Sequence, residues 1–250
     1  MKDSDNISIL LVSPHSPGNV GATARAMKNM GLRRLRLVDP CDPMAPESLS
    51  FAVDAADLLH EAEVYETFEG AVADVQLVFG TTSARGRRKR APLFDVREAG
   101  SRIRALAENQ RLCVAFGPER SGLTEAQLAR CQYLINIPTS PELPTLNLAQ
   151  AVLIVAYEIF TCTGVEPDPD LGLADQSSLD RMFSHIESTL IRIGFLSTSN
   201  PGHIMRSIRR FLARADLTPR DVRILRGIMR QMDWYVRRGR KLDSSRVRKP

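Results

Sequence analysis

Residues 142–159 read ELPTLNLAQAVLIVAYEI, a polar loop followed at once by a helix pattern that is apolar on every side. Most helices of water-soluble proteins carry a single apolar stripe, and a helix that is apolar all round has to be buried on all sides. We therefore expect a helix over Asn147–Thr161 that is buried on all sides.

The residues before this helix alternate between short apolar stretches and helix patterns, with turn signals such as SPHSPGN between them. Alternation of this kind predicts an α/β domain with a mostly parallel sheet that helices cover on both faces. The expected strands are Ile7–Val12, Leu35–Val38, Val75–Gly80, Arg111–Phe116 and Tyr133–Ile137. The expected helices are Val20–Met30, Val53–Glu61, Phe68–Ala73, Asp95–Asn109 and Thr124–Arg130.

Single residues predict several helix ends. Gly31 follows the last periodic residue of the first helix and is interpreted as its C-cap. Asn19 stands just before that helix and is interpreted as its N-cap. Thr124 and Gln127 have the spacing of a capping box, which predicts a helix start at Thr124.

The last third of the chain differs in composition. Residues 163–177 are rich in Gly, Pro and Asp and lack periodicity, which is typical of a linker. Residues 181–250 contain 17 Lys and Arg against 5 Asp and Glu, although the whole chain has a formal net charge of only +5. We expect a domain over residues 1–164, a linker over 165–177 and a basic helical module over 178–250 that binds nucleic acid. The expected helices of this module are Leu179–Ile193, Pro201–Ala215 and Pro219–Arg238.

The composition disfavours several classes of protein. No run approaches the roughly 18 apolar residues of a membrane helix, and the N-terminal MKDSDNISILLV lacks the basic start of a signal peptide. The four Cys and four His form no group with the spacing of a zinc site and no disulfide framework. We therefore expect a cytoplasmic protein with no membrane partner and no bound metal.

Ligands of an open parallel sheet bind outside the carboxyl ends of its strands, so the loops after the strands are the places to search. Gly18 and Gly21 precede a helix, and Asp39 follows about 20 residues later, where a dinucleotide-binding fold would have its ribose-binding acid. The Gly-x-Gly of that motif is absent and no P-loop pattern occurs, so a nicotinamide-dependent enzyme is disfavoured. The candidate loops are Ser13–Arg25, Gly80–Arg90, Phe116–Leu123 and Ile137–Asn147.

Three of these loops carry motifs that resemble, in order and approximate spacing, those of the SPOUT superfamily of RNA ribose methyltransferases. The motifs are NxGxxxR at Asn19–Arg25, FGPERSGL at 116–123 and IPTSPELPTLNLAQA at 137–151. The stretches GNVGATARAMKNMGL and TTSAR and the wording of the third motif are similar to TrmJ-type tRNA 2′-O-methyltransferases. The resemblance covers about residues 7–160 and extends more loosely into the basic module.

The resemblance implies a SPOUT-type sheet with a C-terminal trefoil knot and an obligate homodimer, with S-adenosylmethionine held in the knotted loops. The apolar helix would then lie between the sheet and a second subunit, with Pro144–Asn147 as the cofactor loop. The implied function is S-adenosylmethionine-dependent 2′-O-ribose methylation of tRNA, at the pyrimidine of tRNA position 32 in the anticodon loop. An rRNA 2′-O-ribose methyltransferase of the same superfamily and a non-catalytic RNA-binding protein on the SPOUT fold remain as alternatives.

Carried over residue by residue, the resemblance implies three sets of site residues. A guanidinium stays protonated at ordinary pH and is therefore a poor base. We interpret Arg25 as a clamp that holds the RNA phosphate and orients the ribose 2′-hydroxyl. The implied cofactor contacts are Thr82, Ser83, Ala84, Gly117, Ile137, Pro144, Thr145 and Leu146. The implied catalytic residues are Arg25, Arg85 and Thr145. The implied RNA contacts are Asn19, Arg25, Arg85, Glu119, Asn147, Arg206, Arg209 and Arg210.

The sequence departs from the family pattern at two places. Thr145 stands where the third motif usually has Ser, so the hydroxyl is kept and a methyl group is added. The loop after Arg85 reads GRRKRAPLFD, where similar proteins usually have a stretch containing Trp. The second departure bears on the choice of target more than on the chemistry.

Overall fold

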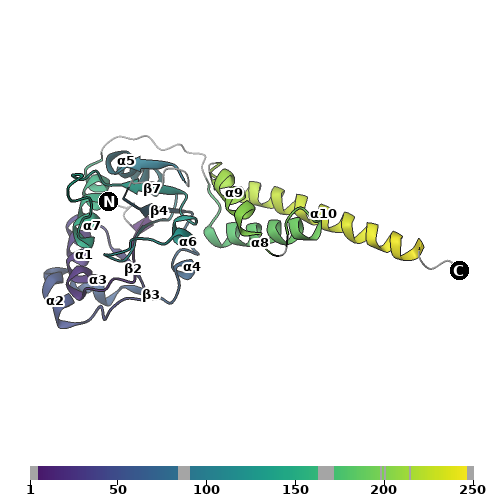
Figure 1. Ribbon diagram of the computed structural model, residues 1–250. Helices are drawn as coiled ribbons and strands as arrows, with labels where there is room; N and C mark the ends of the chain where they lie inside the picture. Colours follow the sequence, from purple (N-terminus) through teal and green to yellow (C-terminus); the bar gives the residue numbers. More distant parts are fainter. Residues whose placement is uncertain are drawn as a thin grey trace. The chain divides into compact units, whose positions relative to one another are not determined.

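The computed structural model describes residues 5–83, 91–162, 172–197, 199, 201–213 and 215–246, without the side chains of residues 213 and 239–246. The chain divides into two compact units, one ending at Leu171 and the other beginning at Gly172 (Figure 1). Each unit has a hydrophobic core of its own and is described by itself.

The first unit contains a seven-stranded sheet in which every pair of neighbouring strands is parallel. Its strands are β1 (Ile7–Val12), β2 (Arg34–Val38), β3 (Glu63–Tyr65), β4 (Leu77–Thr81), β5 (Leu93–Asp95), β6 (Leu112–Phe116) and β7 (Tyr133–Asn136). The strand order is β3-β2-β1-β6-β4-β7-β5. All six residues of β1 are buried, as expected for a strand that helices cover on both faces. The predicted parallel sheet is therefore confirmed, while the trefoil knot stays a prediction.

The two outermost strands, β3 and β5, were not predicted from the sequence. Each has only three residues, EVY and LFD, and none of these residues is buried. A stretch this short has no measurable periodicity, and its pairing with a longer neighbour is what makes it a strand.

Helices cover both faces of the sheet (Figure 1). They are α1 (Pro17–Asn29), α2 (Pro46–Ala52), the short 3₁₀ helix η2 (Val53–Ala55), α3 (Ala56–His60), α4 (Phe68–Ala71), α5 (Val96–Ala107), α6 (Glu125–Leu128) and α7 (Leu148–Thr161). α7 packs between α1 and α5 on one face, whereas Phe68 of α4 and Leu128 of α6 pack with the strands on the other. The single helix expected over Val53–Glu61 is wrong, because Val53 has a positive φ of 52° and the chain is instead divided into α2, η2 and α3.

Helix α1 begins earlier than the sequence suggested. Ser16, and not Asn19, is its N-cap, because the Ser16 side chain accepts a hydrogen bond from the backbone N–H of Asn19. Pro17 then occupies the first helical position, where a missing N–H costs nothing. At the other end Gly31 has a φ of 71°, and the N–H of Leu32 reaches the carbonyl of Met27, which is a Schellman-type ending.

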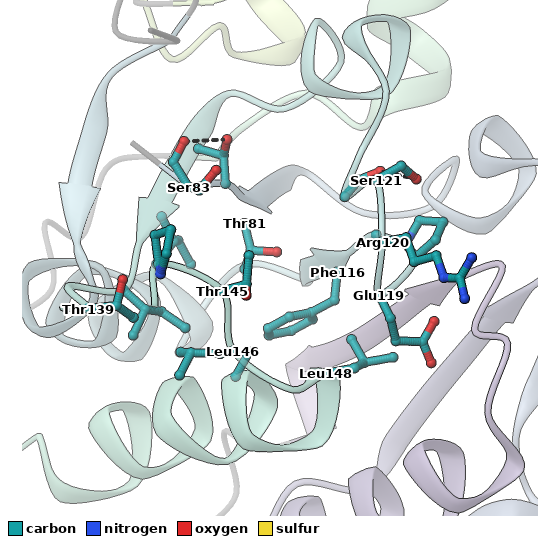
Figure 2. A pocket seen from close by; sticks show the side chains of 18 residues that line it. Thr81, Ser83, Phe116, Glu119, Arg120, Ser121, Thr139, Thr145, Leu146 and Leu148 are labelled. Atoms are coloured by element: carbon teal, nitrogen blue, oxygen red, sulfur yellow. Dashed lines mark hydrogen bonds between the residues drawn. The ribbon is translucent and has the colours of Figure 1, made fainter. Parts of the chain in front are cut away.

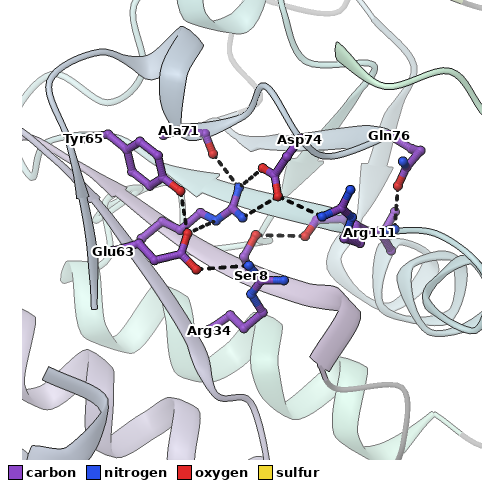
Figure 3. A network of polar contacts seen from close by, with 10 residues as sticks. Ser8, Arg34, Glu63, Tyr65, Ala71, Asp74, Gln76 and Arg111 are labelled. Atoms are coloured by element: carbon purple, nitrogen blue, oxygen red, sulfur yellow. Dashed lines mark hydrogen bonds and ion pairs between the residues drawn. The ribbon is translucent and has the colours of Figure 1, made fainter. Parts of the chain in front are cut away.

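A network of polar contacts around a buried arginine joins β2 to β3 and to the end of α4 (Figure 3). Arg36 of β2 is only 1% exposed. Its guanidinium Nη1 lies 2.6 Å from Oδ1 of Asp74 and donates to the carbonyl of Ala71, and its Nε lies 3.3 Å from Oε2 of Glu63. The same guanidinium lies over the ring of Tyr65. These contacts hold the short strand β3 and the end of α4 against β2.

Helix α7 is buried on one side only. Val152, Val155 and Ile159 are at most 1% exposed, in the direction of α1 and α5. On the other side Leu153, Tyr157 and Phe160 are 39%, 51% and 46% exposed. The described residues of one chain thus leave an apolar face of α7 uncovered. The predicted burial of this helix between the sheet and a second subunit stays a prediction.

The described residues of the second unit form three helices: α8 (Gln176–Arg192), α9 (Gly202–Ala213) and α10 (Pro219–Arg246). Asp175 caps α8, and Thr218 and Asp221 exchange hydrogen bonds at the start of α10. The core contains Met182, Phe183, Ile186, Leu196, Met205, Val222 and Met229. The three predicted helices are confirmed, and α10 runs eight residues beyond its predicted end at Arg238.

Candidate active site

The loops that follow β4, β6 and β7 meet at the carboxyl ends of these strands and enclose a cavity of about 200 Å³ (Figure 2). Figure 2 shows Thr81, Thr145 and Phe116 around its middle, with Thr139 and Glu119 on opposite sides. The lining residues are Thr81–Ser83, Phe116–Gly122, Ile135, Ile137, Thr139, Pro144–Leu146, Leu148 and Ala151. The cavity thus combines hydroxyl groups, backbone and apolar side chains.

Two glycines shape the wall formed by the loop after β6. A Cβ atom on Gly117 would lie 2.2 Å from the backbone of Gly122 and Leu123, so the loop closes on itself only if residue 117 lacks a side chain. Gly122 has a φ of 65°, and its N–H donates to the carbonyl of Pro118. The loop therefore presents backbone atoms to the cavity at close range.

Most of the residues predicted to hold the cofactor line this one cavity. They are Thr82, Ser83, Gly117, Ile137, Pro144, Thr145 and Leu146. Ala84 lies outside the described residues. The sequence did not single out Thr81, Phe116, Ser121 and Thr139, although each of them lies within or beside a loop that it did single out.

A chain of hydrogen bonds joins the three motifs beside the cavity. The carboxylate of Glu119 accepts hydrogen bonds from the backbone N–H groups of His15 and Ser16 and, at 2.8 Å, from Nδ2 of Asn19. Oδ1 of Asn19 accepts from Nδ2 of Asn147, also at 2.8 Å. Oδ1 of Asn147 in turn accepts from the first N–H groups of α7 and caps this helix.

The negative charge of Glu119 determines which group donates and which accepts in each of these hydrogen bonds. Burial opposes ionisation of Glu119, but the hydrogen bonds from Asn19 and from backbone N–H groups outweigh it and hold the pKa below its ordinary value. An ionised carboxylate only accepts, so the Asn19 amide must donate to it and turn its oxygen toward Asn147. Because the Asn147 amide nitrogen then donates to Asn19, its oxygen is directed to the N–H groups in the first turn of α7. Three of the eight residues predicted to contact RNA are thus linked to one another through Asn19.

The predicted arginines lie in different surroundings. Arg25 is exposed on α1 and is not among the residues that line the cavity. Arg85 lies outside the described residues. On α9, Arg206 and Arg210 are exposed. Arg209 instead lies 3.2 Å from Asp180 and stacks over the ring of Phe183, so it helps to pack α9 against α8.

Within the described residues, no group of three or more His, Cys, Asp and Glu side chains is arranged to hold a metal ion. None of the helices in the described ranges is long and apolar enough to cross a membrane.

Comparison with known proteins relates both units to RNA modification. Residues 6–157 match the SpoU rRNA Methylase family, and residues 177–244 match the C-terminal domain of the tRNA methyltransferase TrmJ. A Photorhabdus laumondii protein named tRNA (cytidine/uridine-2′-O-)-methyltransferase TrmJ is 37% identical over 94% of this chain and 99% of its own length. The Salmonella typhimurium protein of the same name is 37% identical over 91% of this chain and 96% of its own. The crystal structure of TrmJ from Z. mobilis superposes with a TM-score of 0.78 at 35% identity, over 90% of this chain and 98% of that one.

Proposed function

The chain belongs to the SpoU rRNA methylase family, and on this premise we propose that it transfers a methyl group from S-adenosylmethionine to the ribose 2′-hydroxyl of tRNA. The observation that carries the proposal is the cavity, in which three loops distant in sequence bring together seven of the eight residues expected to hold the cofactor. We further propose a pyrimidine at tRNA position 32 as the target. A tRNA substrate would place the protein in the cytoplasm.

Two observations favour tRNA over rRNA. The named relatives match nearly the whole chain, and their names specify tRNA. The second unit matches a domain that is itself described as part of a tRNA methyltransferase. An rRNA methyltransferase that shared only the catalytic fold would account for the first unit and not for the second.

The groups that line the cavity suit S-adenosylmethionine. The close approach that Gly117 permits offers backbone N–H and C=O groups to an adenine or a ribose, while Ile137 and Leu146 offer apolar contact. The ionised Glu119 and the positively charged Arg120 both line the cavity, which thus offers a group of either sign to a ligand that carries both charges. When bound, the cofactor would supply an electrophilic methyl group on a positively charged sulfur.

The chain's own groups would orient the ribose and stabilise the charge that develops on its oxygen. Arg25 has the geometry for a two-point contact with a phosphate, and its exposure on α1 leaves it accessible to RNA. The hydroxyl of Thr145 lines the cavity, where it can contact the reacting groups. Positioning of this kind, together with the positive charge near the 2′-oxygen, can supply a large part of the rate enhancement.

We also propose that the protein acts as a homodimer joined through α7. Leu153, Tyr157 and Phe160 are spaced so that they form one exposed apolar stripe on this helix. A second copy would remove that stripe from water, which stabilises association. The polar loop Pro144–Asn147 at the start of α7 would then stand close to the dimer interface.

The proposed function is tested by methyl transfer. Purified protein is incubated with methyl-labelled S-adenosylmethionine and either tRNA or ribosomal RNA, and the product is mapped by mass spectrometry. We expect label on the ribose of a pyrimidine in the anticodon loop of tRNA. Transfer to ribosomal RNA alone would favour the rRNA alternative. Binding of RNA without any transfer would favour the non-catalytic one.

A further inference from the structure

One face of helix α10 packs in the hydrophobic core of the second unit, and another face is exposed. Val222 and Met229 are buried in the core. Trp234 and Tyr235, by contrast, are 50% and 74% exposed. An aromatic side chain that belongs to a hydrophobic core buries most of its large apolar surface. These two rings therefore do not belong to the core of the second unit.

Arginines surround the exposed tryptophan. Residues three and four positions apart lie side by side on a helix, so Arg230 precedes Trp234 by one turn and Arg237 and Arg238 follow it by one. All three of these arginines are exposed. The guanidinium carbon of Arg238 lies 5.1 Å from the centroid of the Trp234 ring. We refer to Arg230, Trp234, Tyr235, Arg237 and Arg238 as the aromatic–arginine face.

The positive charge of this region is not neutralised by its own acids. Residues 219–238 contain six Arg and two Asp. Asp221 accepts hydrogen bonds from Thr218 in the cap of α10. Asp233 lies 3.3 Å from His185 and is paired with Arg192 of α8. Both carboxylates are thus engaged elsewhere, and the aromatic–arginine face keeps a net positive charge.

This combination selects among partners. A second copy of the same face would bring two arginine-rich surfaces together, which electrostatic repulsion opposes. A paired RNA helix would satisfy the arginines but would hide its bases from the rings. An unpaired stretch of RNA offers both phosphates and flat base surfaces, which stack on aromatic side chains.

We infer that the aromatic–arginine face binds an unpaired segment of RNA, with a base stacked on Trp234 or Tyr235 and the flanking arginines on the phosphates. The inference rests on the proposed tRNA function and adds to it a place on the second unit where unpaired nucleotides bind. Stacking and phosphate contact contribute separately, because loss of a phosphate contact changes the salt dependence of binding whereas loss of a stacked base does not.

The chain offers a reporter at this site, because Trp234 is its only tryptophan. The full-length protein is titrated with tRNA, with an eight-nucleotide oligouridine and with a fully paired RNA duplex, while the tryptophan fluorescence is followed. We expect quenching by tRNA and by oligouridine, and little change with the duplex. Quenching by the duplex as strong as by oligouridine would overturn the inference.

Variants separate the two contributions. Trp234→Ala and Tyr235→Ala are compared with Trp234→Phe and Tyr235→Phe by filter binding to tRNA across a salt series. We expect at least one of the two alanine variants to bind about five- to a hundredfold more weakly with an unchanged salt slope, and its phenylalanine counterpart to recover most of the affinity. Arg237→Ala should instead lower the slope of log affinity against log salt by about 0.7–0.9 in magnitude.

Phe195→Ala is the matched control, because this ring is 62% exposed and lies on the connection between α8 and α9. It should leave tRNA affinity unchanged. Methyl transfer is measured in parallel to separate two failures. If wild-type protein methylates tRNA while its fluorescence is unaffected and both alanine variants bind normally, the inference is wrong and the proposed function stands. If tRNA is neither bound nor methylated, both are wrong.

Discussion

Asn147 donates a 2.8 Å hydrogen bond to Asn19 although the two residues are 128 positions apart in the sequence. Asn19 belongs to α1 and Asn147 caps α7, so the bond joins the N-terminal ends of two helices that pack against each other. Glu119, in the loop after β6, accepts a further hydrogen bond from the Asn19 side chain. Three segments that border the candidate active site are therefore held in one arrangement by polar side chains.

Removal of this bond should reduce stability cooperatively. Asn19→Ala and Asn147→Ala each remove one partner, and the double variant removes both. We expect the two single effects to sum to more than the effect of the double variant, with a coupling of about 0.5–1.5 kcal/mol in urea unfolding. Strictly additive effects would show that the bond contributes nothing beyond the separate side chains.

Thr145→Ala should weaken both cofactor binding and turnover. The third motif usually has Ser at this position, and the hydroxyl is the group that Ser and Thr share. Loss of the hydroxyl leaves a polar partner unpaired, which costs about 1–3 kcal/mol. Thr145→Ser keeps the hydroxyl and should be close to neutral. Cofactor affinity by calorimetry and single-turnover rates provide the two readouts, and an alanine variant equal to wild type would return Thr145 to an ordinary loop residue.

Arg25→Lys should abolish methyl transfer while cofactor affinity stays within a few-fold of wild type. Lysine keeps the positive charge but lacks the planar fork that holds a phosphate at two points. Arg33→Lys provides a control, because Arg33 is also exposed and lies beyond the end of α1. Near wild-type turnover of Arg25→Lys would reduce the role of Arg25 to that of a simple charge.

The ion pair between Arg36 and Asp74 should make stability depend on pH. The hydrogen bond from Arg36, aided by its charge, lowers the pKa of Asp74 below the ordinary 3.8 in spite of partial burial. Because the folded-state pKa is the lower one, the stabilisation is present above pH 3.8 and is lost as the pH falls through the folded-state value. Unfolding of wild type and Asp74→Asn should therefore differ most near neutral pH and converge in acid.

Asp57→Asn is the control for this experiment. Asp57 also forms an ion pair, with Lys28 at 2.8 Å, but both side chains are about half exposed. Pairs of this kind contribute little to stability. A pH dependence as large for Asp57→Asn as for Asp74→Asn would show that the burial of Arg36 is not what makes the Asp74 pair important.

Tyr157→Glu should separate the proposed dimer into monomers, because it places a charge in the middle of the exposed apolar stripe of α7. Val64→Glu, at a residue of β3 that is 60% exposed, should leave the assembly intact. Sedimentation equilibrium gives the mass of each variant. A wild-type mass of one chain at micromolar concentration would contradict the dimer proposal.

The sequence by itself determined the features that depend on neighbours along the chain. Five of the six residues of β1 are apolar, which is typical of a strand buried on both faces, and the spacing of Thr124 and Gln127 is typical of a helix start. Gly31 and Gly117 indicated the end of α1 and the tight loop after β6. Glycine is the residue that adopts a positive φ or a close backbone contact without strain, so its position in the sequence is informative by itself. The cavity-lining residues that are predicted to hold the cofactor were identified from sequence motifs, which are also local.

The tertiary structure decided which groups meet across the chain. The residue types of Asn19, Glu119 and Asn147 indicated donors and acceptors, but their partners depend on how α1, α7 and the loop after β6 pack. For the same reason the burial of Arg36 inside the sheet and the pairing of Arg209 with Asp180 could not be predicted. Burial and pairing are long-range properties, because the chain segments that exclude water from a group or bring it a partner lie far from it in the sequence.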